Sequence, residues 1–297
     1  MELPGWLREE LRRNVGSEVL ASYSVGGGMI CRAARVEFSQ GAVFVKWSEQ
    51  AASRMFDDER DGLASLRDAG ALRVPAVVAC GPRPGDPGGG YLVLEFVHAS
   101  EPRDAPAFGT RFGERLAALH RAPDPGRGLF GYHRDNHLGL LVQANPWRDR
   151  WWEFYRDCRV APQVERARSR GLLHAGLERL LEEVLGSVEA LLGEAPHEPA
   201  LVHGDLWSGN LLCSDGEPVV VDPAVYGAHR EVELAYVELF GGFPATWRDA
   251  YQSCYPVDAG YVRRRPLLQL YPLLVHLNHF GEQYSPHVEE VCRAALR

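Results

Sequence analysis

Cysteine is scarce in this chain of 297 residues. There are six cysteines, far apart, and no CxxC pair. A chain of this length normally buries about 75% of its unfolded surface, so it needs no disulfide or metal to stay folded. Sparse cysteine in a large chain is typical of a reducing cytosol rather than of a secreted disulfide scaffold. We therefore expect a cytoplasmic protein.

Long apolar runs are also missing. The N-terminal residues MELPGWLREELRR contain no apolar segment of the kind found in signal peptides. The longest apolar stretch, PLLQLYPLLVHLNHF, is interrupted by polar residues and by Pro272. A membrane-spanning helix needs about 20 apolar residues. The sequence therefore predicts a soluble protein without a membrane partner.

Basic residues are outnumbered by acidic ones. The chain has 32 Lys and Arg against 40 Asp and Glu, a net charge of -8. Such a surface repels phosphate backbones, so we expect no nucleic-acid partner. Two enzyme signatures are missing as well: GxxxxGK followed by Ser or Thr, and GxSxG. Their absence argues against a P-loop NTPase and an α/β-hydrolase.

The two halves of the chain differ in pattern. Up to residue 97, short β-like runs alternate with turns, and afterwards the apolar spacing becomes helical. We predict strands at 42–47, 77–80 and 91–97, a glycine- and proline-rich loop at 81–90, and helices at 51–69, after Asp104 and at 173–191. This pattern predicts a small strand-rich lobe, residues 1–97, a linker near 95–99 and a larger helical lobe, residues 98–297.

The densest polar cluster is HGDLWSGN, residues 203–210, which lies between apolar runs. VVVDP follows, with an aspartate at the end of a predicted strand. Asp205, Asn210 and Asp222 thus form the D-x4-N plus downstream Asp pattern of kinase catalytic loops. One carboxylate would accept the proton of an attacking hydroxyl. An amide oxygen and a second carboxylate would hold Mg²⁺ against the phosphates of ATP.

The N-terminal half contains matching parts. Lys46 lies in the β-run VFVK, and Glu59 lies in the helix predicted next. A Lys–Glu pair fixes the ammonium group against the phosphates in kinases. The glycines at 26–28 would let backbone N–H groups approach phosphate closely, although Cys31 stands where a GxGxxG motif has its last glycine.

These motifs resemble the fructosamine kinase (ketosamine 3-kinase) family, within the aminoglycoside and choline kinase-like group. LVHGDLWSGNLL, VVVDPAVYGAHREVELAYVELFGGFP and LNHFG carry the resemblance. It implies an α+β, bilobal, protein kinase-like fold and the use of ATP and Mg²⁺. The implied roles fall on Asp205 as catalytic base; Asn210 and Asp222 for magnesium; Lys46 and Glu59 as the phosphate-positioning pair; Gly26, Gly27 and Gly28 as the phosphate loop; and Glu95, Phe96 and Val97 as the hinge that binds adenine. Several family members have a redox-active cysteine just after the loop glycines, where this chain has Met29.

The acceptor implied by the resemblance is the 3-hydroxyl of a ketosamine, free or on a glycated protein. Trp207 either packs on the sugar or on the core of its lobe. Glu231 and His279 are further candidates for sugar contacts, although the former could instead bond backbone or an arginine. We expect His203 and His120 to hold the backbone in place, and Glu233 to bond local backbone or an arginine. The pattern makes no prediction of the oligomeric state.

Two other functions fit parts of this pattern. A kinase for an aminoglycoside, choline or methylthioribose would keep the same magnesium residues and change only the acceptor site. A pseudokinase scaffold would not need the intact set of Lys46, Glu59, Asp205, Asn210 and Asp222.

Overall fold

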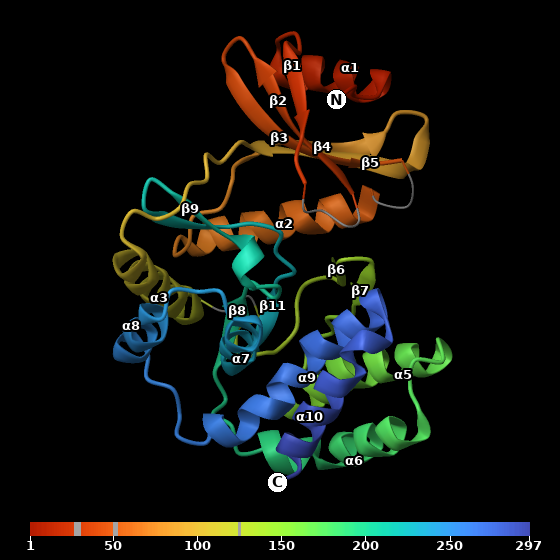
Figure 1. The fold of residues 1–297 in the computed structure, drawn as a ribbon, viewed down its shortest axis with the longest axis vertical. Coiled ribbons are helices and arrows are strands. Elements are labelled where there is room, and N and C mark those ends of the chain that lie inside the picture. The colour runs from red at the N-terminus through yellow and green to blue at the C-terminus, as the bar shows by residue number, and fades with distance from the viewer. Residues whose placement is uncertain (27–30, 50–52, 124–125) are drawn as a thin grey trace.

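The structure is a computed structural model that describes residues 1–26, 31–49, 53–123 and 126–297. Figure 1 shows a lobe built on a β-sheet above a larger lobe of helices. The α+β, two-lobed architecture predicted from the sequence is therefore confirmed. The boundary expected between residues 97 and 98 falls in the segment that joins the last strand of the sheet to the first helix of the lower lobe.

The upper lobe contains a five-stranded antiparallel sheet in the order β1-β2-β3-β5-β4. Its strands are β1 Ala21–Ser24, β2 Arg32–Phe38, β3 Gly41–Ser48, β4 Val77–Arg83 and β5 Asp86–Glu95. The hairpin predicted from the Gly/Pro stretch is present, but its expected length of 81–90 is wrong, because β4 and β5 continue into the stretch and leave only Pro84 and Gly85 as the turn. Gly85 takes a φ of 77°, which a two-residue turn requires, and the edge position of β4 tolerates Pro82.

One helix covers each face of this sheet. α1 (Gly5–Val15) packs Leu7 and Leu11 on one face, together with Val93 of β5. α2 (Ser53–Ala69) packs on the other face, against the residues that alternate with Val93 along the strand. The sequence did not reveal α1, because only two of its residues are buried and charged residues surround them.

The lower lobe is mainly helical. Its helices are α3 Ala105–Arg121, α4 Trp151–Tyr155, α5 Ala161–Ser169, α6 Ala175–Leu192, α7 Glu231–Phe240, α8 Thr246–Cys254, α9 Tyr261–Phe280 and α10 Ser285–Ala295, with a π-helical turn at Arg156–Val160 and 3₁₀ turns at Ser208–Asn210 and Glu282–Tyr284. Asp104 caps α3 as predicted, since its Oδ1 accepts a hydrogen bond from Ala107 N at 2.9 Å. Among the described residues, no helix is long and apolar enough to cross a membrane.

Three two-stranded sheets complete the lower lobe. They are β6 Asn136–Leu138 with β7 Leu141–Gln143, β8 Pro199–Val202 with β11 Tyr226–His229, and β9 Leu211–Ser214 with β10 Glu217–Val220. The loop 203–210 joins β8 to β9, and the loop 221–225 joins β10 to β11. Since both strand pairs are antiparallel, the two loops leave them on the same side. The pairing thus brings together the two parts of the predicted catalytic pattern.

Candidate active site

The catalytic loop begins in a conformation that only glycine adopts easily. Gly204 has a φ of 84°, and a Cβ at this position would lie 2.1 Å from the carbonyl oxygen of Ala224. Ala224 N donates to His203 O at 2.9 Å, and the His203 ring lies 2.9 Å from Val221 O through Nε2. The loop is therefore tied directly to the segment that contains Asp222, and His203 holds backbone as predicted.

A buried glutamate on α7 anchors the same loop. Glu233 accepts hydrogen bonds from Gly204 N at 2.8 Å and from His203 N at 3.1 Å. His120 Nε2 contacts its second oxygen at 3.0 Å. Burial alone would raise the pKa of Glu233, but the hydrogen bonds from His120 and the loop hold it below its ordinary value. The predicted structural role of Glu233 is confirmed, and His120 acts on the backbone through this carboxylate.

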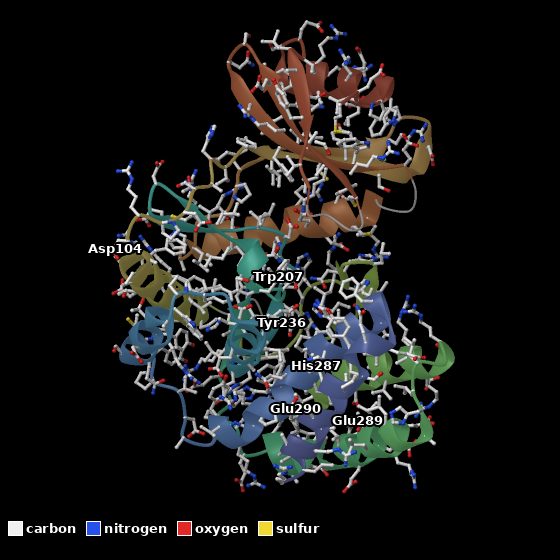
Figure 2. All side chains as sticks on the ribbon, in the orientation of Figure 1. Asp104, Trp207, Tyr236, His287, Glu289 and Glu290 are labelled. Carbon is white, nitrogen blue, oxygen red and sulfur yellow. The ribbon has the colours of Figure 1, made fainter. Side chains whose placement is uncertain are left out.

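Asp205 has both carboxylate oxygens occupied by neighbours. Tyr236 donates its hydroxyl to Oδ1 at 2.6 Å, and Asn210 Nδ2 contacts Oδ2 at 3.1 Å. Burial raises the pKa of Asp205 to about 7, Asp222 adds to the rise, and the hydrogen bonds from Tyr236 and Asn210 oppose it. Tyr236 lies on α7 (Figure 2) and within the quoted motif VVVDPAVYGAHREVELAYVELFGGFP, but the sequence predicted no role for it.

Lys46, Glu59 and Asp222 meet at the junction of the two lobes. Lys46 Nζ lies 2.9 Å from Glu59 Oε1 and 2.5 Å from Asp222 Oδ1. Burial alone would lower the pKa of Lys46, but the two carboxylates raise it. Burial raises the pKa of Glu59, Lys46 opposes that rise and Asp222 adds to it. The predicted Lys–Glu contact is present, and the structure adds Asp222 to it.

Asp222 has a left-handed backbone conformation. Its φ of 58° is unusual for a residue with a side chain, although aspartate tolerates it better than most. Val221 N donates to Asn210 O at 3.1 Å, so the two predicted magnesium residues lie on adjoining segments. Asn210 uses its amide nitrogen to contact Asp205, which leaves the amide oxygen out of that interaction.

The predicted hinge follows the last strand of the sheet. Glu95 N donates to Ala76 O at 2.8 Å, and the Glu95 carboxylate pairs with Arg73 at 2.6 Å. The backbone N–H of Glu95 is therefore already used, and the N–H groups of Phe96 and Val97 remain the candidates for adenine. Of the predicted phosphate loop, Gly26 is exposed after β1, whereas Gly27 and Gly28 lie outside the described residues.

Trp207 lies on the surface of the catalytic loop rather than in the core. The residue is 44% exposed, and its ring covers Gly209 so closely that a Cβ there would lie 2.1 Å from the indole. Of the two alternatives left open by the sequence, packing in the core of the lobe is wrong. The indole is therefore exposed on the loop that contains Asp205.

Two other predicted sugar contacts differ from one another. Glu231 is buried, and Arg264 donates to its two oxygens at 2.6 and 2.8 Å. That carboxylate is therefore engaged within the lobe and is not free for a sugar. His279 is half-buried at the end of α9, with Nε2 3.3 Å from Leu138 O, and its ring is partly accessible.

The chain also resembles known sequences and solved structures over nearly its whole length. The family model described as fructosamine kinase matches residues 7–297. The chain belongs to the fructosamine kinase family. A probable ketoamine kinase of Synechocystis sp. is 38% identical over 92% of this chain and 90% of its own length. The ketosamine-3-kinase of Mus musculus is 33% identical, over 92% and 94% of the two chains.

Solved structures agree with this family membership. A candidate fructosamine-3-kinase from Thermobifida fusca superposes with a TM-score of 0.87, at 37% identity over 98% of each chain. An aminoglycoside phosphotransferase superposes with a TM-score of 0.68 at 17% identity over 98% of each chain, a likeness that shows the fold alone. The kinase-like fold and the assignment to a phosphotransferase family predicted from the sequence are both confirmed.

Proposed function

We propose that this enzyme transfers the γ-phosphate of ATP to the 3-hydroxyl of a ketosamine, with Asp205 as the catalytic base. The observation that carries the proposal is the meeting of Lys46 from the sheet with Asp222 at 2.5 Å, beside the loop that contains Asp205. The names of the curated relatives, among them the mouse ketosamine-3-kinase, support the choice of acceptor.

The pKa of Asp205 suits the role of a general base. Its pKa of about 7 lets the carboxylate be ionised near neutral pH and still accept a proton. Tyr236 and Asn210 hold the two oxygens in place, so the group needs little reorganisation when the acceptor hydroxyl approaches. The proton leaves the hydroxyl for Asp205 as the hydroxyl oxygen attacks the γ-phosphorus and ADP departs.

Asn210 and Asp222 fit a magnesium ion. Both residues offer hard oxygen donors, and they lie on adjoining segments. The Asp222 side chain is 45% exposed, and one of its oxygens contacts Lys46. Mg²⁺ keeps part of its water shell, so two protein ligands are sufficient. When bound, the ion would neutralise the charge of the ATP phosphates.

The nucleotide would lie between the lobes. Lys46 would contact its phosphates, with Glu59 orienting the ammonium group. Backbone groups of Phe96 and Val97 would bind adenine, and the glycines at 26–28 would approach the phosphates. As the sequence implied, we propose that residues 1–97 bind the nucleotide and that residues 98–297 carry the base and the acceptor site.

The acceptor would lie beside the exposed indole of Trp207, with His279 as a candidate hydrogen-bonding partner. A ring face packs well on the CH groups of a sugar. Phosphate on O3 is a leaving group next to the C2 carbonyl of the ketosamine. When C1 loses a proton, the resulting enaminol can expel inorganic phosphate from C3. Water then adds to the C=N bond at C1 and releases the free amine and a 3-deoxy dicarbonyl sugar. The enzyme would thus remove sugar from glycated amines, small or protein-bound.

An acceptor panel tests this function. We expect ADP release with fructoselysine, ribuloselysine or a morpholino-fructose, little release with kanamycin or choline, and phosphate on O3 by NMR. ADP release without acceptor is the background to subtract. Turnover restricted to kanamycin or choline would contradict the ketosamine assignment and leave the kinase assignment intact.

Trp207→Ala tests the acceptor side of the site. It should raise the acceptor KM roughly fivefold and leave the ATP KM nearly unchanged, since an aromatic contact contributes on the order of 1 kcal/mol. Trp152→Ala, which removes a half-buried indole of α4 that stacks on Arg156, serves as the control. Equal acceptor KM values for the two variants would remove Trp207 from the acceptor site.

A further inference from the structure

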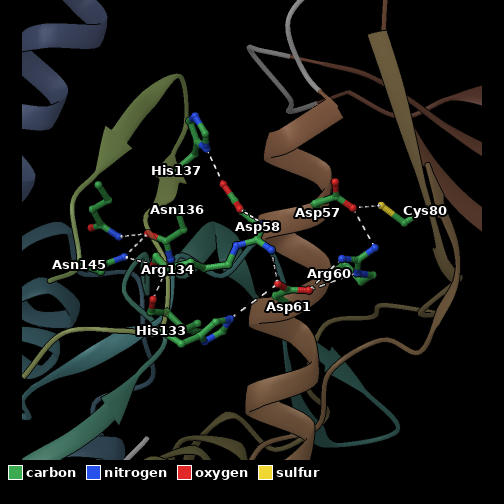
Figure 3. Close-up of polar contacts among 12 residues, drawn as sticks. Asp57, Asp58, Arg60, Asp61, Cys80, His133, Arg134, Asn136, His137 and Asn145 are labelled. Carbon is green, nitrogen blue, oxygen red and sulfur yellow. Dashed lines mark hydrogen bonds and ion pairs between the residues drawn. The ribbon is translucent and has the colours of Figure 1, made fainter. Parts of the chain in front are cut away.

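A short segment of the lower lobe forms ion pairs and a hydrogen bond with helix α2 of the upper lobe. The segment, residues 132–137, leads into β6, and Figure 3 shows its side chains reaching α2. Asp58, Asp61 and Ser65 of α2 are three and four residues apart, so they share one face of the helix. Glu59, the partner of Lys46, lies on the same helix.

The contacts between segment and helix are mainly ionic. Arg134 pairs with Asp58 and also reaches Asp61 at 2.7 Å. His137 Nδ1 lies 2.6 Å from the second oxygen of Asp58. One turn further along α2, the hydroxyls of Ser65 and Tyr132 are 2.5 Å apart. We call this set the α2 clasp.

The clasp is partly removed from water. The side chain of Asp58 is only 3% exposed, against 31% for Arg134 and 16% for His137. A carboxylate at this depth depends on its partners, because removal of one partner leaves a buried charge uncompensated. The clasp therefore differs from the exposed ion pairs of α1, which contribute little.

The segment is itself fixed beside the residues that follow Asp222. Asn136 Nδ2 donates to Val225 O at 2.8 Å, and Gln143 Nε2 donates to Ala224 O at 3.2 Å. α2 touches the same loop, since a Cβ on Gly62 would lie 3.1 Å from Pro223 Cγ. The contacts of the segment and of α2 thus fix the position of α2 relative to the loop that carries Asp222.

We propose that Arg134 and His137 are positioning residues that hold α2 at the depth where Glu59 reaches Lys46. They act through the helix and touch neither nucleotide nor acceptor. When the clasp opens, Glu59 draws back and Lys46 loses one of the two carboxylates that orient it. The proposal rests on the nucleotide role of Lys46 within the proposed function and is independent of which acceptor is used.

Arg134→Gln tests the clasp, with Arg60→Gln as the matched control. Arg60 also contacts Asp61, at 3.1 Å, but its other partner is Asp57 at 2.8 Å, so all its ion pairs stay within α2. We expect Arg134→Gln to raise the Kd for a fluorescent ATP analogue about tenfold, as misplacement of a positioning group does. Arg60→Gln should change it less than about twofold. Arg134→Lys, which restores the charge, should recover part of the affinity.

A double-mutant cycle separates positioning from loss of stability. In a Glu59→Gln background, Arg134→Gln should have little further effect on nucleotide Kd, because the group that it positions is already altered. The loss of thermal stability should remain additive. Equal and additive losses of affinity in both backgrounds would overturn the proposal.

A milder pair of variants covers the case in which Arg134→Gln does not fold. His137→Ala should weaken nucleotide binding, and His137→Asn, which can still donate to Asp58, should restore most of it. Identical affinities for these two variants and the wild type would overturn the proposal. Nucleotide binding needs no acceptor. These affinities therefore test the clasp even if no ketosamine proves to be a substrate.

Discussion

At Asp205, burial and two hydrogen bonds act in opposite directions on one carboxylate. Burial raises its pKa to about 7, and the hydroxyl of Tyr236 and the amide of Asn210 limit that rise. The base is active only when ionised, so turnover should fall as the pH falls through this pKa. The residue thus links a structural contact on α7 to a measurable pH dependence.

Tyr236→Phe should move the acid limb of the kcat profile to higher pH. The variant removes a hydrogen bond that favours the ionised carboxylate, so the pKa of Asp205 should rise by roughly one unit. The measurement is kcat against pH at saturating substrates. Tyr155→Phe is the control, because that buried hydroxyl donates to Leu267 O instead. An unchanged or more acidic inflection in Tyr236→Phe would contradict this account of the base.

At the scale of the element, α7 carries two buried glutamates, and one of them supports the catalytic loop. Glu233 accepts from the backbone of His203 and Gly204, whereas Glu231 pairs with Arg264. Both carboxylates are almost completely buried. Only the first of them bonds to the loop that contains Asp205.

Glu233→Gln and Glu231→Gln should therefore separate stability from catalysis. Each should lower the free energy of unfolding by about 2–3 kcal/mol, because each loses hydrogen bonds to a charged group. Only Glu233→Gln should also lower kcat at a temperature where both variants are folded. Urea denaturation and turnover on the same preparations check this. Equal losses of kcat would show that the loop does not depend on Glu233 specifically.

At the scale of the whole molecule, the sequence predicted the parts of the site that lie in local motifs. Lys46 and Asp222 are 176 residues apart in sequence. The motifs around them predicted a role for each beside the phosphates of ATP, but not the direct contact between the two side chains. The sequence predicted no role for Tyr236, although it lies within a quoted motif, or for Arg134, which lies in none of them. Their contacts depend on how α7 and the segment before β6 pack, and no fixed spacing records that packing.

In the fold, too, the features with a clear local pattern were predicted and those without one were not. The strand-rich and helical halves were visible because apolar periodicity reports burial directly. α1 was not, because its two buried leucines leave too weak a pattern. β4 continues past its expected end and β5 begins before its expected start, because an edge position and a two-residue turn tolerate the glycines and prolines that usually mark a loop.

Asp205→Asn tests the central claim most directly, since it keeps the size of the base and removes its ability to accept a proton. ADP release at saturating ATP and fructoselysine should fall by at least about 100-fold, while the Kd for the nucleotide stays close to that of the wild type. Circular dichroism should show a folded variant. Near-normal turnover by folded Asp205→Asn would contradict the assignment of this residue as the base and, with it, the mechanism proposed for the site.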